Sequence, residues 1–166
     1  MRKIITVVAA VTVVFLGVWF CLFCLIYPLK YESEITNAAA KYDVSPSLIA
    51  SLINAESSFN KNKISKKGAI GLMQVLPSTA NYVTDQNLNL FNAADNIDVG
   101  VHYLANLIKK FGDVDTALFA YNAGEGNVTR WLSEQGTTKL TSCPFPETNA
   151  YVEKIKKGVN FYRGRL

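Results

Sequence analysis

The sequence predicts an all-α domain that follows one long apolar segment. Apolar residues recur at spacings of three and four in successive stretches, as they do on the buried face of a helix. Polar segments with Gly, Pro or helix-capping residues separate these stretches. No run of alternating apolar and polar residues is long enough to predict a strand. We expect at most a small hairpin, in residues 61–72.

The apolar segment comes first in the chain. Residues 4–27 carry no charge and follow Arg2 and Lys3. As a helix this segment would be about 36 Å long, enough to cross a hydrocarbon layer of about 30 Å. We therefore predict a transmembrane or signal-anchor helix in residues 1–30 and a separate domain in residues 31–166.

Two other interpretations of this segment are weaker. A cleavable secretory signal usually ends in small residues, whereas bulky side chains precede Pro28. A lipid-modified cysteine follows a small residue, but Phe20 and Phe23 stand before Cys21 and Cys24. The basic residues before the segment predict a cytoplasmic N terminus, with the domain on the outer, cell-wall side of a single-pass membrane protein.

Two helices open the domain. The first, residues 32–42, carries apolar side chains on one face. The second starts at Pro46 with Ser45 as its N-cap, because proline suits the first helical position and a serine hydroxyl accepts hydrogen bonds from free amides. Its apolar stripe continues to Glu56, so a carboxylate stands where a core residue is expected. A short helix should follow Pro77.

The last four expected helices share two signals: a cap or glycine at one end, and apolar residues three or four apart. They are residues 92–110, which Asn92 opens and Gly112 ends; 113–122, which breaks at Gly124; 126–135; and 147–162, after a loop with two prolines. Asn92 and Asp95 resemble a capping box in which aspartate replaces the usual glutamate. The whole pattern favours helices packed around one core.

Composition argues against several kinds of site. Two of the 17 basic residues precede the apolar segment, which leaves 15 against 13 acidic residues, too weak a charge for a nucleic-acid module. Cys143 has no second cysteine in the domain to pair with. The single histidine, His102, lies in the middle of a helix and suits a structural role better than a catalytic one. We expect no metal site and no cofactor.

Four lysines lie close together in the loop after Glu56. They are Lys61, Lys63, Lys66 and Lys67. The cluster has two interpretations: a surface that faces an anionic polymer, or an ordinary solvated loop, which we favour.

Glu56 is the strongest candidate for chemistry. A buried carboxylate costs free energy unless it is paired, hydrogen-bonded or protonated. Burial also raises its pKa toward the range of a general acid at neutral pH. The helix could equally end near Ala55 and turn Glu56 to solvent, and the spacing alone leaves both interpretations open.

Three short motifs then occur in a specific order. Glu-Ser stands at residues 56–57, Gly-Leu-Met-Gln at 71–74 and Ala-Tyr-Asn-Ala-Gly at 120–124. In this order and at these separations they resemble the signature motifs of the lytic transglycosylase (SLT) domain, a lysozyme-like fold that cleaves peptidoglycan. The resemblance extends over residues 34–162.

The resemblance implies a reaction with one catalytic carboxylate. Glu56 would protonate the β-1,4 bond between N-acetylmuramic acid and N-acetylglucosamine, then act as base on the muramoyl 6-hydroxyl, which attacks its own anomeric carbon. The product would be a 1,6-anhydromuramoyl end. The N-acetyl group of the substrate would replace the second carboxylate that most glycosidases use.

It also implies a set of substrate-binding residues, each at a position that matches a family motif. They are Ser65, Gly71, Met73, Gln74, Tyr121, Asn122, Glu147 and Tyr151. Residues 147–152 resemble the family's closing motif, in which the glutamate, here Glu147, binds substrate and the tyrosine, here Tyr151, forms a hydrogen bond near the catalytic acid. Family members often have arginine where Asn149 stands. By residue type alone, Met73 and the two tyrosines would suit the core.

Two alternative functions fit the same features. A lysozyme-type hydrolase would use an activated water and leave a reducing sugar end, and a non-catalytic module would only bind the wall for another machine. For the favoured enzyme we expect three partners: peptidoglycan strands, the membrane through the N-terminal helix, and a secretion, conjugation or division complex. No nucleic acid is expected.

Overall fold

The computed structural model describes residues 11–18 and 26–166. No helix in these two ranges is long and apolar enough to cross a membrane. Most of the predicted span, residues 4–27, lies outside the described residues, so the membrane anchor stays a prediction.

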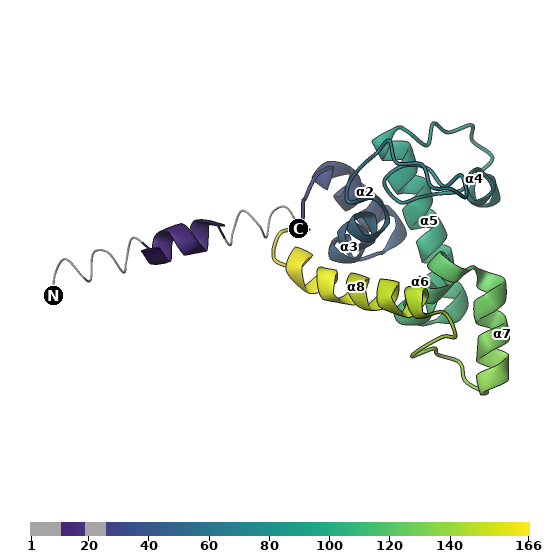
Figure 1. The fold of residues 1–166 in the computed structure, drawn as a ribbon. Coiled ribbons are helices and arrows are strands. Elements are labelled where there is room, and N and C mark those ends of the chain that lie inside the picture. The colour runs from purple at the N-terminus through teal and green to yellow at the C-terminus, as the bar shows by residue number, and fades with distance from the viewer. Residues whose placement is uncertain (1–10, 19–25) are drawn as a thin grey trace.

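The described domain is all-α, as predicted, and its helices begin and end close to their expected bounds (Figure 1). In chain order they are α2 (Glu32–Tyr42), α3 (Pro46–Ser57), α4 (Pro77–Val83), α5 (Ala93–Phe111), α6 (Val114–Ala123), α7 (Glu125–Gln135) and α8 (Pro146–Tyr162). The region of the expected hairpin holds two isolated antiparallel bridges, Ile64 with Ile70 and Ile70 with Val75, in place of regular strands. We call residues 58–76 the α3–α4 loop.

Helix α3 lies in the middle of the domain. It packs against α2 and α8, which lie on either side of it in Figure 1. Ile49, Leu52 and Ile53 have no exposed surface. Because α3 is buried on several sides, the side chains at its C-terminal end are held by neighbours from more than one element.

Two of the predicted caps differ in detail. Ser45 stands at the N-cap of α3, but its hydroxyl pairs with that of Ser47, 2.8 Å away, and makes no capping bond. The Asn92 side chain accepts hydrogen bonds from two amides of α5, as expected. Asp95 does not complete a capping box, because its carboxylate accepts from the Asn89 amide at 3.1 Å.

The contact between α3 and α8 depends on a glycine. Ser51 Oγ donates to the Ile155 carbonyl at 2.7 Å. A Cβ on Gly158 would lie 2.2 Å from the same Oγ, so no side chain fits between the helices there. The helices run antiparallel, and this contact therefore sets the distance between Glu56 on α3 and Tyr151 on α8.

The chain before residue 31 also packs on the domain. Tyr27 stacks on Phe161 with ring centroids 4.2 Å apart, and the Tyr162 hydroxyl donates to the Pro28 carbonyl at 2.9 Å. The C terminus accordingly lies beside the point where the N-terminal segment reaches the domain (Figure 1). The folded unit thus includes residues that precede the expected boundary.

Candidate active site

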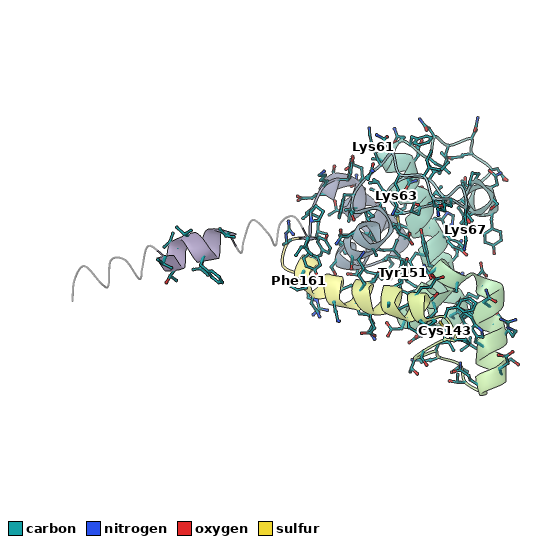
Figure 2. The ribbon with its side chains drawn as sticks, viewed as in Figure 1. Lys61, Lys63, Lys67, Cys143, Tyr151 and Phe161 are labelled. Atoms are coloured by element: carbon teal, nitrogen blue, oxygen red, sulfur yellow. The ribbon has the colours of Figure 1, made fainter. Side chains whose placement is uncertain are left out.

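Glu56 lies in the last turn of α3, and its side chain is half-buried. Tyr151 approaches it from α8, and the tyrosine hydroxyl donates to Glu56 Oε1 at 2.6 Å. The resemblance implied this neighbour, and Figure 2 shows Tyr151 on α8 below the loop that carries Lys63. The interpretation that turned Glu56 to solvent is wrong.

Burial shifts the protonation of Glu56 toward the acid. Desolvation raises the pKa of its carboxyl above the ordinary 4.5, and the hydrogen bond from Tyr151 and the charges of Lys63 and Lys154 only partly oppose the rise. A raised pKa favours the protonated form that a general acid needs. Because Tyr151 occupies Oε1, Oε2 is the oxygen available to hold a transferable proton.

Tyr121 joins the site from α6. Its hydroxyl donates to the Met73 carbonyl at 3.0 Å, and its ring centroid lies 5.4 Å from that of Tyr103. Burial raises the pKa of Tyr121 and of Tyr151 well above the ordinary value, and the nearby Glu56 charge raises both further. Both phenols are therefore neutral hydrogen-bond donors beside the acid.

The α3–α4 loop is tied together by its glutamine. Gln74 Nε2 donates to the carbonyls of Lys63 and Gly71, at 3.1 and 3.0 Å. Gly71 has a positive φ of 79°, and a Cβ there would lie 2.3 Å from Asn96 Nδ2, so the position requires glycine. In this structure Gly71 is buried and the Gln74 side chain binds backbone of its own loop.

Asn96 supports the same loop and is not among the predicted residues. Its side chain, 1% exposed, accepts from the Met73 amide at 2.8 Å and donates to the Ile70 and Leu90 carbonyls at 2.9 Å each. One amide thus forms hydrogen bonds with three backbone groups. The available signal was a polar residue four positions before Gly100, on a buried face of α5.

Met73 has no exposed surface, which disagrees with its expected role in binding substrate. Its side chain packs on α5, where a Cβ on Gly100 would lie 2.6 Å from the sulfur. Asn96 and Tyr121 bond to its backbone amide and carbonyl. Met73 therefore supports the site from the core.

Other predicted residues bond within the domain. Ser65 Oγ accepts from the Ala69 amide at 3.0 Å and closes a turn of the α3–α4 loop. Asn122 Oδ1 accepts from the Thr148 hydroxyl at 2.8 Å, which joins the end of α6 to the start of α8. Glu147 is exposed in the first turn of α8, next to Thr148. Asn122 and Glu147 therefore lie at one helix junction.

The side chains of Asn149 and His102 both contact other residues of the domain. The Asn149 side chain accepts from the Cys143 amide and donates to its carbonyl, both at 2.8 Å, and so holds the loop before α8. His102 stacks on Tyr42, with ring centroids 4.9 Å apart.

In the described ranges, no group of three or more His, Cys, Asp or Glu side chains is placed to hold a metal ion.

A cavity of about 270 Å³ adjoins Tyr103 and was not predicted. It is lined by Ser78, Thr79, Tyr82, Tyr103 and Glu125. Burial, reinforced by the nearby Glu125 charge, raises the pKa of Tyr103 to about 12, and Glu125 also forms an ion pair with Lys110. Because the Tyr103 ring contacts that of Tyr121, the cavity lies close to the tyrosines beside the acid.

The family model described as the transglycosylase SLT domain matches residues 33–142. The chain belongs to this family. The match includes Glu56, the α3–α4 loop and Tyr121, whereas Tyr151 lies beyond it, so the hydrogen bond from Tyr151 to Glu56 joins α8 to the matched region.

Two curated relatives of the SLT domain are named transglycosylases. The soluble lytic murein transglycosylase of Salmonella typhimurium is 31% identical, over 82% of this chain and 23% of that protein. The transglycosylase of Enterobacteria phage PRD1 is 34% identical, over 82% of this chain and 45% of that protein. This chain thus spans less than half the length of either relative.

A solved structure shares the fold. The lytic transglycosylase Slt from Pseudomonas aeruginosa, solved as an inactive Glu-to-Gln mutant, superposes with a TM-score of 0.73 at 26% identity, over 84% of this chain and 25% of that one. The all-α, lysozyme-like fold expected for the SLT domain is confirmed.

Proposed function

We propose that this SLT domain is a peptidoglycan lytic transglycosylase with Glu56 as its one catalytic carboxylate. The observation that carries the proposal is the pair of Glu56 and Tyr151: a half-buried carboxyl with a raised pKa, held by a neutral phenol. The inactive Glu-to-Gln mutant of the Pseudomonas relative supports a glutamate in this role.

In the first step, Glu56 transfers its proton from Oε2 to the oxygen of the β-1,4 bond between N-acetylmuramic acid and N-acetylglucosamine. The bond from this oxygen to the muramoyl anomeric carbon breaks, and the N-acetylglucosamine end leaves as an alcohol. The N-acetyl group of the muramoyl unit assists in place of a second carboxylate.

In the second step, the Glu56 carboxylate takes the proton of the muramoyl 6-hydroxyl, whose oxygen bonds to the anomeric carbon. A 1,6-anhydromuramoyl end forms, Glu56 is protonated again, and no water is consumed. Tyr151 remains a donor to Oε1 throughout, and its hydrogen bond strengthens when the acceptor becomes charged.

Substrate contacts are proposed on both sides of the acid. Asn122 and Glu147 are exposed at the α6–α8 junction, and Ser65 and Gln74 are half-buried in the α3–α4 loop. Their side chains carry the hydrogen-bonding groups that sugar hydroxyl and amide groups require. We assign these four residues to substrate binding.

The cavity beside Tyr103 is proposed as part of the same binding surface. Its two tyrosines, Tyr82 and Tyr103, offer flat apolar rings with polar tips, and Ser78 and Thr79 add hydroxyl groups. This combination suits a sugar ring, which has apolar faces and a polar edge.

The test of the catalytic role is Glu56→Gln, with Glu134→Gln as the matched control because Glu134 is exposed on α7. We expect Glu56→Gln to lose peptidoglycan turnover by at least about 100-fold, the typical contribution of a general acid, while it still co-sediments with peptidoglycan. The control should cleave like wild type. Near-normal turnover in Glu56→Gln would contradict the proposal. If the wild-type protein itself binds peptidoglycan but does not cleave it, the domain is a binding module.

Location and partners are proposed from residues 1–30 alone. We propose a single-pass membrane protein with its domain on the cell-wall side, available to a secretion, conjugation or division complex. Membrane fractionation, followed by protease treatment of intact and opened cells, tests the location: a domain found in the soluble fraction contradicts it.

A further inference from the structure

We infer that Lys63 and Lys154 are positioning residues that bind the C-terminal carbonyls of α3 and stabilise the Glu56 carboxylate once its proton has been transferred. The inference rests on the proposed function, in which Glu56 is first an acid and then a base. Neither lysine is among the predicted site residues.

The two ammonium groups reach one helix end from different elements. Lys63, in the α3–α4 loop, donates from Nζ to the Glu56 carbonyl. Lys154, one turn after Tyr151 on α8, donates from Nζ to the Ala55 carbonyl at 3.5 Å. The last carbonyls of a helix carry the negative end of its dipole, so cations are favoured there. The residue that bears the acid is thus held through its own backbone.

Lys63, labelled in Figure 2, is held in turn by residues of the Gly-Leu-Met-Gln motif. Its carbonyl accepts from the Gly71 amide at 2.9 Å and from Gln74 Nε2 at 3.1 Å. The ammonium group of Lys63 in turn donates to the backbone carbonyl of Glu56. Gly71 and Gln74 therefore act on the acid through Lys63, in addition to any contact with substrate.

The groups that face Glu56 come from three elements. They are Tyr151 and Lys154 from α8, Lys63 from the α3–α4 loop, and Tyr121 from α6. Burial raises the pKa of both tyrosines so far that they stay neutral. The two lysines are therefore the cations that act on the carboxyl, whose pKa they lower against the larger effect of desolvation.

This balance suits a group that has to lose and regain a proton. Burial alone would penalise the carboxylate that forms when the glycosidic oxygen takes the proton. A direct ion pair would hold Glu56 ionised and prevent it from acting as the acid. Within the described part of the chain, the ion pairs do not join Glu56 to a lysine. The lysines bind neighbouring carbonyls, from which their charge reaches the carboxylate at longer range.

The test compares Lys63→Met and Lys154→Met with two matched controls. These are Lys61→Met in the same loop and Lys157→Met on α8, both exposed lysines that do not contribute to the pKa shift of Glu56. Glu56 is titrated in the full chain by carbon-13 NMR of the glutamate carboxyls, with Glu56→Gln to assign its resonance. The pH dependence of kcat/KM on peptidoglycan is measured in parallel.

We expect each site variant to raise the pKa of Glu56, and the double variant to raise it further. Because the reaction starts from the protonated acid, the alkaline limb of the pH profile should move up by the same shift. Lys63→Arg, which keeps the cation, should restore the wild-type titration, and both controls should titrate like wild type.

An unchanged Glu56 titration in Lys63→Met and Lys154→Met, or an equal shift in the controls, overturns the inference. A lower Tm with an unchanged titration assigns the lysines to helix capping alone and overturns it as well. If the wild type releases no fragments from peptidoglycan, the proposed function fails, whereas the NMR titration still decides whether the lysines act on Glu56.

Discussion

Gly158→Ala tests whether the α3–α8 contact positions the acid. The new Cβ would lie 2.2 Å from Ser51 Oγ and 3.2 Å from Ser51 Cβ. The hydroxyl can rotate away, but it then gives up its buried hydrogen bond to the Ile155 carbonyl. Otherwise α8 moves away from α3, and Tyr151 moves with it. Either response weakens the arrangement around Glu56.

The net cost follows from two opposing effects. Loss of a buried hydrogen bond costs about 1–3 kcal/mol, while alanine in place of glycine within a helix gains about 0.5–1 kcal/mol. We therefore expect Gly158→Ala to lower the free energy of unfolding by up to about 2.5 kcal/mol. Turnover should fall by more than the loss of folded protein explains, because the hydrogen bond from Tyr151 to Glu56 depends on the same contact.

Urea unfolding and peptidoglycan turnover measure the two effects in the full chain. Ser51→Ala/Gly158→Ala serves as the control, because removal of the hydroxyl relieves the closest clash, and the double variant should be more stable than the sum of the two single changes. A Gly158→Ala protein with wild-type stability and turnover would refute the reasoning.

Three further predictions concern the acid and the loop beside it. Tyr151→Phe removes a hydrogen bond to a carboxylate worth about 1.5–3 kcal/mol, so turnover should fall about 10- to 150-fold and the pKa of Glu56 should rise; unchanged steady-state kinetics would contradict this. Glu56→Gln should be more stable than wild type at neutral pH. Between pH 4.5 and the raised pKa, Glu56 of the wild type ionises in the unfolded state before it ionises in the folded state, so the free energy of unfolding of the wild type falls as the pH rises. The difference in unfolding free energy between Glu56→Gln and wild type should therefore grow over that window and stay constant above it. Asn96→Leu leaves the Met73 amide and the Leu90 carbonyl without a partner, while the Ile70 carbonyl keeps its hydrogen bond from the Val75 amide, and should cost about 2 kcal/mol or more in urea unfolding; a loss below about 1 kcal/mol would show that the loop does not depend on this amide.

The ends of the helices were predictable because their signals are local. Pro46, Asn92 and Gly112 act within one turn of the helix end that they define, so the residues alone predict the boundary. Ser45 shows the limit of such signals. Its hydroxyl could bond either to a free backbone amide of α3 or to the side chain of Ser47, and the sequence does not determine which partner it takes in the folded chain.

The site was predictable in part. The spacing of α3 placed Glu56 on an apolar face, and the resemblance to a family supplied Tyr151 as its neighbour, which the structure confirms. Met73 was assigned to substrate because its position matches a family motif, although its residue type suits a core, and the structure buries it completely. The polar Asn96 on a buried face of α5 was a signal for a buried amide, but its partners, like that of Lys154, lie far away in the sequence and could not be predicted.

The most direct test of the central claim is mass spectrometry of the fragments that the full chain releases from purified peptidoglycan. A reaction in which Glu56 serves as both acid and base predicts 1,6-anhydromuramoyl ends, and none with Glu56→Gln. Reducing muramic acid ends, heavier by one water molecule, would contradict the claim, because they require a water-activating group that the proposed mechanism does not contain.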